Sequence, residues 1–159
     1  MPNTPAPNTH FIGYYLSGYA DGEGSFLISF SPRPKFHTSL EVRPSFTVSQ
    51  NSDRSEVLYL FKEFLGCGTI RRNVSDRTLK FEVRSIKNLI EKVIPHFMHY
   101  PLISSKRKDF DMFVQICHMV NQKQHLEKDS LINIVELSYQ MNGFGARRYM
   151  KEKLLSCIR

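Results

Sequence analysis

The chain has 159 residues, enough for one domain with a buried core, and its 22 lysines and arginines exceed its 15 aspartates and glutamates. The resulting formal charge of +7 favours a polyanionic partner, most often nucleic acid, although charge alone leaves an ordinary basic protein equally open. The 3 widely spaced cysteines argue against a disulfide or zinc framework. No apolar run reaches the length of about 18 residues that a membrane span requires.

The first ten residues contain three prolines and no lysine or arginine, which predicts a flexible arm and not a signal or transit peptide. We therefore expect a single folded domain over residues 11–159, beginning with a helix over residues 11–21. Phe11, Tyr15 and Tyr19 recur every four residues, so they are expected to form one apolar face of this helix.

A second face of the same helix carries Gly18 and Gly22, one turn apart. Glycines at this spacing let another helix approach closely, because they have no side chain to separate the two axes. The alternative is that Gly22 is only a helix C-cap and Gly18 is incidental. A glycine inside a helix costs about 1 kcal/mol relative to alanine, which favours the close contact.

Residues 16–24 read LSGYADGEG and place two carboxylates, Asp21 and Glu23, where the helix is expected to end. The C-terminal end of a helix carries partial negative charge, which disfavours acids at this position. A bound cation reverses that argument, since carboxylates and free backbone carbonyls are the oxygen ligands of Mg²⁺ and Ca²⁺. The motif therefore predicts a cation site at the end of the helix.

Two segments that alternate between apolar and polar residues follow the motif, over residues 25–31 and 41–49, and predict an antiparallel hairpin. A second hairpin is expected over residues 69–72 and 78–85. The inward positions of the two hairpins are Phe26, Ile28, Phe30, Val42, Phe46, Val48, Leu79, Phe81 and Val83.

The remaining segments have helical periodicity. An amphipathic helix over residues 54–65 separates the hairpins, and a helix over residues 86–97, broken at Pro95, follows the second one. Further helices are expected over residues 108–120, 130–141 and 146–158. The predicted order is α-β-β-α-β-β-α plus extra helices, an α+β fold.

The outward faces of both hairpins are polar and partly cationic. A β-ribbon of this kind fits the major groove, where arginine and lysine suit guanine edges and phosphates and serine and threonine suit most bases. A solvated sheet face is the alternative; two such faces in a basic chain with an acid pair favour the groove. The candidate DNA-binding residues are Ser29, Ser31, Arg33, Lys35, Glu41, Arg43, Ser45, Thr47, Arg71, Arg72, Asn73, Lys80, Glu82 and Arg84.

The LSGYADGEG segment resembles the LAGLIDADG motif, and residues 11–115 resemble a single-motif LAGLIDADG homing endonuclease of the homodimeric, intron-encoded type. The resemblance rests on the motif helix, the hairpin after it, Gln50 at the end of that hairpin, and the basic cluster at residues 106–108. It implies an αββαββα fold whose curved antiparallel sheet is a DNA-binding saddle, with extra C-terminal helices. It also implies a homodimer whose two motif helices pack about a two-fold axis through Gly18 and Gly22.

The resemblance assigns the metal-binding acid to Glu23, where the family usually has aspartate, and makes the Gly22 carbonyl the expected second ligand. Mg²⁺ is the expected cofactor, with Ca²⁺ binding without supporting cleavage and Mn²⁺ able to substitute. Asp21 takes either a supporting role or that of a structural cap.

The resemblance also assigns the polar residues around the metal. Gln50 matches a position that orients the water or the metal shell. Arg54 and Lys106 match basic residues that hold the phosphate, and Lys108 is the alternative to Lys106 within the same cluster.

The implied function is metal-dependent hydrolysis of both strands of a long pseudo-palindromic DNA target, leaving short 3′ overhangs. The alternatives are an RNA-binding intron maturase or a catalytically inactive DNA-binding regulator on the same scaffold, and a basic α+β protein without nuclease function. An organelle-encoded protein of a chloroplast or mitochondrion is expected, or otherwise a cytoplasmic protein of a prokaryote.

Overall fold

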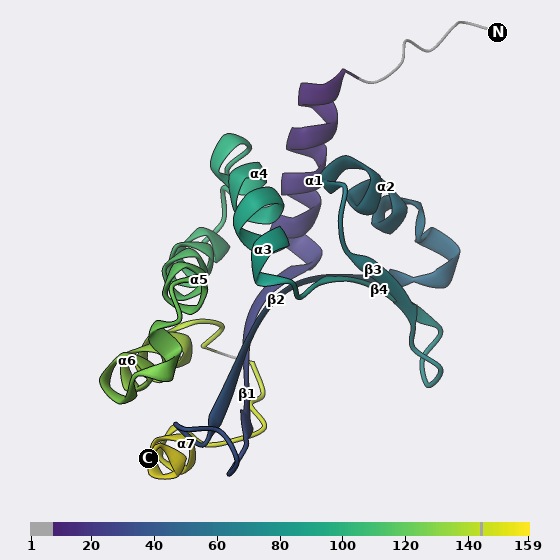
Figure 1. Ribbon diagram of the computed structural model, residues 1–159. Coiled ribbons are helices and arrows are strands. Elements are labelled where there is room, and N and C mark those ends of the chain that lie inside the picture. Colours follow the sequence, from purple (N-terminus) through teal and green to yellow (C-terminus); the bar gives the residue numbers. More distant parts are fainter. Residues whose placement is uncertain (1–7, 144) are drawn as a thin grey trace, which may run out of the picture.

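The structure is a computed structural model that describes residues 8–143 and 145–159 (Figure 1). The rest of the expected arm lies outside these residues, and the first helix already begins at Thr9, within that arm. The helices are α1 (Thr9–Glu23), α2 (Glu56–Leu65), α3 (Ile86–Asn88), α4 (Ile94–His99), α5 (Lys106–Asn121), α6 (Lys128–Gln140) and α7 (Lys151–Cys157). The strands are β1 (Gly24–Pro32), β2 (Leu40–Asn51), β3 (Thr69–Arg72) and β4 (Thr78–Val83). Short 3₁₀ helices span Ser52–Arg54 and Gln124–Leu126.

The strands form one 4-stranded antiparallel sheet in the order β1-β2-β4-β3. The register pairs Phe26 with Phe46 and Phe46 with Val83, so the predicted inward positions share one face. Figure 1 shows a curved sheet with α1, α2, α4 and α5 on one side and its other face open. The α+β fold and the α-β-β-α-β-β-α order predicted from the sequence are confirmed.

Phenylalanine rings fill the space between the sheet and the helices. At the centre lies Phe26, whose ring centroid is 5.2 or 5.3 Å from those of Phe46, Phe97, Phe110 and Phe113. All five rings are buried. This cluster fastens α4 and α5 to the first hairpin, and so holds the loop between these two helices near the end of α1.

The motif helix α1 is fastened to α4 at close range. A Cβ atom at Gly13 would lie 2.4 Å from the Tyr100 ring, so the ring rests on bare helix backbone. The Ser17 hydroxyl donates to the Tyr100 carbonyl at 2.6 Å. Because a serine has one proton to donate, its 3.1 Å contact with His96 is a bond donated by Nε2 of the histidine.

The aromatic face predicted for α1 is formed, but a single chain buries little of it. Phe11 is 64% exposed and Tyr15 is 47% exposed, and their rings stack at a centroid distance of 6.5 Å. Only Tyr19 packs inward, with its ring 6.3 Å from that of Phe61 in α2. The helix therefore presents apolar rings to solvent along most of its length.

Two helix predictions are wrong at particular residues. The helical segment over residues 86–99 continues through Pro95, because a π-helical turn at Leu89–Val93 widens the helix where proline lacks an N–H group. Residues 146–150 form no helix, and α7 begins only at Lys151. Among the helices that the structure describes, none has the length and hydropathy to cross a bilayer.

Burial lowers the pKa of His96 to about 4 in the folded protein, with a smaller contribution from the charge of His99. An unfolded histidine titrates near 6.5, so the unfolded chain binds more protons between these pH values. The free energy of unfolding should therefore have its full value above about pH 6.5. It should fall by about 3 kcal/mol as the pH approaches 4, because His96 binds a proton only in the unfolded chain over this range. Urea unfolding at pH 7 and pH 4.5 measures this. His96→Gln, which keeps an N–H donor for Ser17, should flatten the dependence; an unchanged pH profile would contradict the assignment.

Candidate active site

Of the two acids in the motif, Glu23 is the one whose carboxylate is unpaired within the described residues. It is the last residue of α1 and is exposed, and within residues 8–143 and 145–159 its carboxylate has no hydrogen-bond or ion-pair partner. The helix ends at Gly24, where a Cβ atom would lie 2.7 Å from the Ala20 carbonyl oxygen. Glycine is required there because the chain turns tightly from helix to strand. The C-cap is therefore Gly24, and the C-cap alternative for Gly22 is wrong.

The other acid of the motif, Asp21, holds a distant loop. One carboxylate oxygen accepts the backbone N–H groups of Ile103 (3.0 Å) and Ser104 (2.9 Å), and the other accepts the Ser104 hydroxyl. Burial raises the pKa of Asp21, but these hydrogen bonds and the charge of Lys106 outweigh it, so the pKa lies below its usual value. Asp21 thus stays ionised and fastens the start of α5 to the end of α1.

The lysine that reaches the end of α1 is Lys106, the first residue of α5. Its Nζ donates to the carbonyl oxygens of Ala20 (2.9 Å) and Gly24 (2.6 Å). The Ala20 carbonyl also accepts the N–H of the C-cap residue Gly24. Burial lowers the pKa of Lys106, and the charges of Asp21, Glu23 and Asp109 oppose that shift. In contrast, the side chain of Lys108 is exposed.

Gln50 and Arg54 lie on the α2 side of the motif helix. Gln50 Nε2 donates to the hydroxyl of Tyr19, and its Oε1 accepts the N–H of Asn51 at 2.8 Å. Gln50, Arg54 and Tyr19 together line a groove between α1 and α2. Arg54 ends a 3₁₀ helix before α2, so it does not belong to the first turn of an α-helix as expected. The contact between Tyr19 and Gln50 has no signal in the sequence beyond the tyrosine itself, which occupies a position where the motif has leucine.

The donor atoms at the end of α1 are of the type that a hard divalent cation binds, namely a free carboxylate and helix-end carbonyls. Within the part of the chain that the structure describes, no group of three or more histidine, cysteine or acidic residues forms a ligand cluster. Of the two motif acids, only Glu23 has a carboxylate without a hydrogen-bond or ion-pair partner among the described residues. The set fits a divalent cation only if phosphate oxygens or a second chain complete the coordination.

The open face of the sheet gathers most of the predicted DNA-binding residues. Residues directly opposite each other in the register share a face, which groups Ser29 with Arg43, Ser31 with Glu41, Thr47 with Glu82, and Arg71 with Lys80. Ser45 and Arg84 continue the same alternation, whereas Arg33 and Lys35 lie in the loop between β1 and β2.

Ion pairs organise this face. Glu41 accepts from Arg33 at 3.1 Å and lies 3.5 Å from Arg43, and Arg43 also donates to the Ser31 hydroxyl at 3.2 Å. Glu82 and Arg84 form a 2.9 Å pair. These contacts hold the guanidinium groups in place before any partner binds.

Five of the predicted contacts differ from expectation. Ser45, Thr47 and Glu82 are only 6%, 4% and 7% exposed, because they lie on β2 and β4, the two inner strands of the sheet. Arg72 pairs with Leu79 and so lies on the opposite face from Arg71. Asn73 is engaged in its own turn, where it donates to Asp76 at 3.0 Å and accepts from the Ser75 hydroxyl at 2.9 Å.

The contrast between the two motif acids gives a stability prediction. Asp21 accepts three hydrogen bonds through its two carboxylate oxygens. Asp21→Asn removes the negative charge and replaces one of these oxygens with an NH₂ group, so the unfolding free energy should fall by about 1 kcal/mol or more. Glu23→Gln should leave it unchanged to within about 0.5 kcal/mol, because the Glu23 carboxylate has no partner in the described residues. Urea unfolding of both variants at pH 7 measures the difference. Equal stabilities would show that Asp21 does not fasten the loop.

Comparison with known proteins agrees with this geometry. The family model described as LAGLIDADG endonuclease matches residues 16–117. A probable intron-encoded endonuclease of Neurospora crassa is 31% identical over 91% of this chain, which spans 32% of that relative's length. The structure of the I-LtrWI LAGLIDADG homing endonuclease bound to target DNA superposes with a TM-score of 0.87, at 32% identity, over 94% of this chain and 50% of that one.

An archaeal intron-encoded homing endonuclease, I-Vdi141I, complexed with DNA, matches with a TM-score of 0.86 and 27% identity. The similarity covers 94% of this chain and 96% of that one, so the two folds agree over nearly their whole lengths. The motif at residues 16–24, the saddle-shaped sheet and these matches lead to one conclusion: the chain belongs to the LAGLIDADG endonuclease family.

Proposed function

We propose that this chain is a site-specific homing endonuclease that cuts both strands of a long pseudo-palindromic DNA duplex and leaves short 3′ overhangs. The observation that carries the proposal is the open Glu23 carboxylate at the end of α1, with the Lys106 ammonium group bound to the same helix end. The open face of the sheet, with its arginines and hydroxyls, is the proposed surface for the duplex. Its direct base contacts would come from the residues that share that face.

The proposed active form is a homodimer in which two α1 helices pack side by side. A Cβ atom at Gly18 or Gly22 would meet no atom of the same chain within 4 Å, so contacts inside one chain do not require these glycines. The exposed rings of Phe11 and Tyr15 on α1 add apolar area that a second chain would bury. The two-fold axis would bring two copies of Glu23 together, and their repulsion would favour cation binding.

The proposed cofactor is Mg²⁺, bound by Glu23 and the Gly22 carbonyl, with Mn²⁺ able to substitute and Ca²⁺ binding without supporting cleavage. When bound, the metal supplies an activated water and charge stabilisation for the leaving 3′ oxygen. Lys106 and Arg54 would hold the scissile phosphate and its developing negative charge. Gln50, held by Tyr19, would orient the attacking water.

The location that we propose is an organelle, either a chloroplast or a mitochondrion, or otherwise the cytoplasm of a prokaryote. The intron-encoded endonucleases of fungi favour the first location, and the archaeal homing endonucleases favour the second.

Glu23→Gln should abolish DNA cleavage and keep DNA binding. The amide has the shape of the carboxylate but lacks the charge that a divalent cation requires, so we expect a rate loss of at least about a hundredfold. Affinity for the target duplex in Ca²⁺ should change by only a few fold. Asp129→Asn, which removes an acid from the first turn of α6, is the matched control and should cut normally. Cleavage at the wild-type rate by Glu23→Gln would overturn the assignment.

The dimer has a test that does not depend on activity. Sedimentation of the wild type should give twice the chain mass of 18.5 kDa. Gly18→Leu should give a folded chain of single mass, because the added side chain meets open space in one chain but would separate two packed helices. A wild type that stays monomeric at all concentrations would contradict the two-fold arrangement.

A further inference from the structure

The C-terminal part of the chain lies beyond the residues that match the family model, yet it returns to the sheet. After α6 the chain passes beside β1, one of the two edge strands of the sheet (Figure 1). There the Asn142 side-chain amide donates to the Phe26 carbonyl of β1 at 2.8 Å. The connection between α6 and α7 is therefore held against the edge of the proposed DNA-binding face.

Arg147 gives this connection its shape. Its guanidinium donates to the carbonyls of Ser138 (2.6 Å) and Met141 (2.5 Å), at the C-terminal end of α6, and lies 4.2 Å from the centroid of the Tyr139 ring. The Tyr139 hydroxyl in turn donates to the Tyr149 carbonyl at 2.5 Å. These contacts close the connection onto α6 and take the place of helical hydrogen bonds in residues 146–150.

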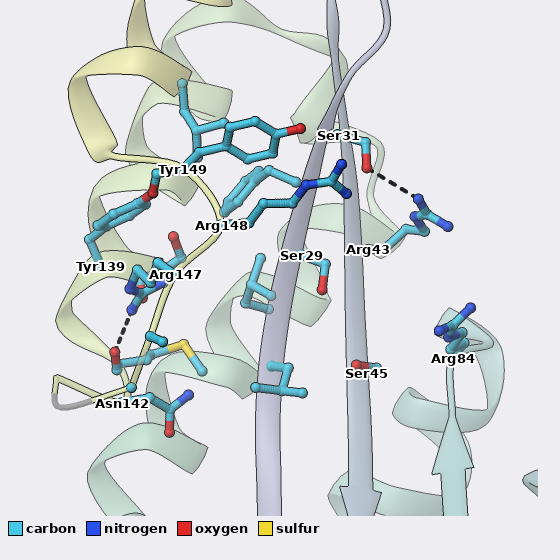
Figure 2. A pocket seen from close by; sticks show the side chains of 18 of the residues that line it. Ser29, Ser31, Arg43, Ser45, Arg84, Tyr139, Asn142, Arg147, Arg148 and Tyr149 are labelled. Carbon is cyan, nitrogen blue, oxygen red and sulfur yellow. Dashed lines mark hydrogen bonds between the residues drawn. The ribbon is translucent and has the colours of Figure 1, made fainter. Parts of the chain in front are cut away.

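Arg148, the next residue, points the opposite way. Figure 2 shows its side chain extending across β1 toward Ser31 and Arg43 on the open face of the sheet. The space between the connection and the sheet is a cleft of about 420 Å³, with Arg148 on one wall and Ser31 and Arg43 on the other. Within residues 8–143 and 145–159, Arg148 forms no hydrogen bond or ion pair, and its guanidinium lies 5.4 Å from the Tyr149 ring.

Unlike the nearby arginines on the sheet, Arg148 has no carboxylate that compensates its charge among the described residues. Arg33 and Arg43 both face Glu41, and Arg84 pairs with Glu82. Each of these carboxylates offsets part of the attraction that its arginines exert on an anion. Arg148 has no carboxylate partner among the described residues, so its full charge is available at the rim of the cleft.

We propose that Arg148 binds a phosphate of the DNA backbone at the edge of each half-site, an assignment that rests on the DNA-cutting function proposed above. Arg148 comes from a segment outside the four strands, and its guanidinium reaches the rim of the open face over an edge strand, which suits a contact with the DNA backbone. Phosphate contacts add affinity and set the register of the protein on the duplex, and they carry no base preference of their own. The segment that follows α6 thereby widens the DNA-binding surface beyond the four strands.

The test compares Arg148→Ala with the wild type for binding to target duplex in Ca²⁺ over a range of monovalent salt. Each phosphate contact contributes about 0.9 to the slope of log affinity against log salt, so the two copies in a dimer should reduce the slope by about 1.8. The affinity advantage of the wild type should therefore shrink about tenfold between about 50 and 200 mM salt. The loss should be the same for target and mismatched duplexes.

Three matched variants separate this role from others. Lys128→Ala removes an equal charge from the exposed start of α6 and should leave the slope unchanged. Arg148→Lys should keep most of the slope. Arg147→Ala should lower the melting temperature, whereas Arg148→Ala should not, because only Arg147 binds the end of α6.

Three outcomes would overturn the proposal. An unchanged salt slope in Arg148→Ala would exclude a phosphate contact, and a loss confined to certain base pairs would make Arg148 a base reader. If the wild type binds intron RNA and no duplex DNA, the proposed endonuclease function fails together with this one. The first two outcomes leave the wild-type cleavage activity intact, so the two failures are distinguishable.

Discussion

The negative end of helix α1 is the constraint on which the site depends. The helix dipole, two motif carboxylates and the free carbonyls accumulate negative charge at one place, which is unfavourable unless cations compensate for it. Lys106 supplies one internal cation by donating to the Ala20 and Gly24 carbonyls. Asp21 strengthens that arrangement because it binds the backbone just before Lys106. One acid and one lysine thus lock the helix end to α5, and Glu23 is left free for chemistry.

The open face of the sheet likewise carries charged side chains that are paired within the chain and others that are not. Arg33, Arg43 and Arg84 are held by glutamates, which fixes their guanidinium groups and reduces their net attraction for phosphate. Pre-formed ion pairs of this kind favour discrimination between bases over raw affinity, since a base edge must replace or share the carboxylate contact. If Arg148 binds a backbone phosphate as we propose, its uncompensated charge would supply attraction without selectivity. Affinity and specificity would come from different residues on one surface.

Local patterns in the sequence were sufficient for most of the fold. Alternation with a period of two residues predicted the strands and their inward faces, because that pattern depends only on neighbouring residues. Helical periodicity predicted α2, α5 and α6 to within a few residues. It failed over residues 146–150, where the guanidinium of Arg147 satisfies the end of α6 and holds the chain out of a helix. The break expected from Pro95 is absent as well, because a π-helical turn compensates for the missing N–H group.

The candidate site was predictable in part. The identity of Glu23 follows from the motif and that of Lys106 from the basic cluster at residues 106–108, and the structure brings both to the end of α1. The partners of Asp21 and Gln50 were not predictable, since Ser104 and Tyr19 lie far from them along the chain. Arg72 was assigned to the DNA-binding face although strand alternation puts it opposite Arg71. The role of the connection after α6 depends on tertiary contacts that no spacing in the sequence indicates.

The central claim, that this chain cuts DNA at a specific site, is tested most directly by a cleavage selection. The protein would be incubated with a randomised or genomic duplex library in Mg²⁺, and separately in Ca²⁺, and the ends that it produces would be sequenced. Site-specific cleavage predicts recurrent 3′-overhang ends flanked by an imperfect palindrome in Mg²⁺ and none in Ca²⁺. Duplex that is bound but cut in neither metal, or no interaction with duplex DNA at all, would contradict it.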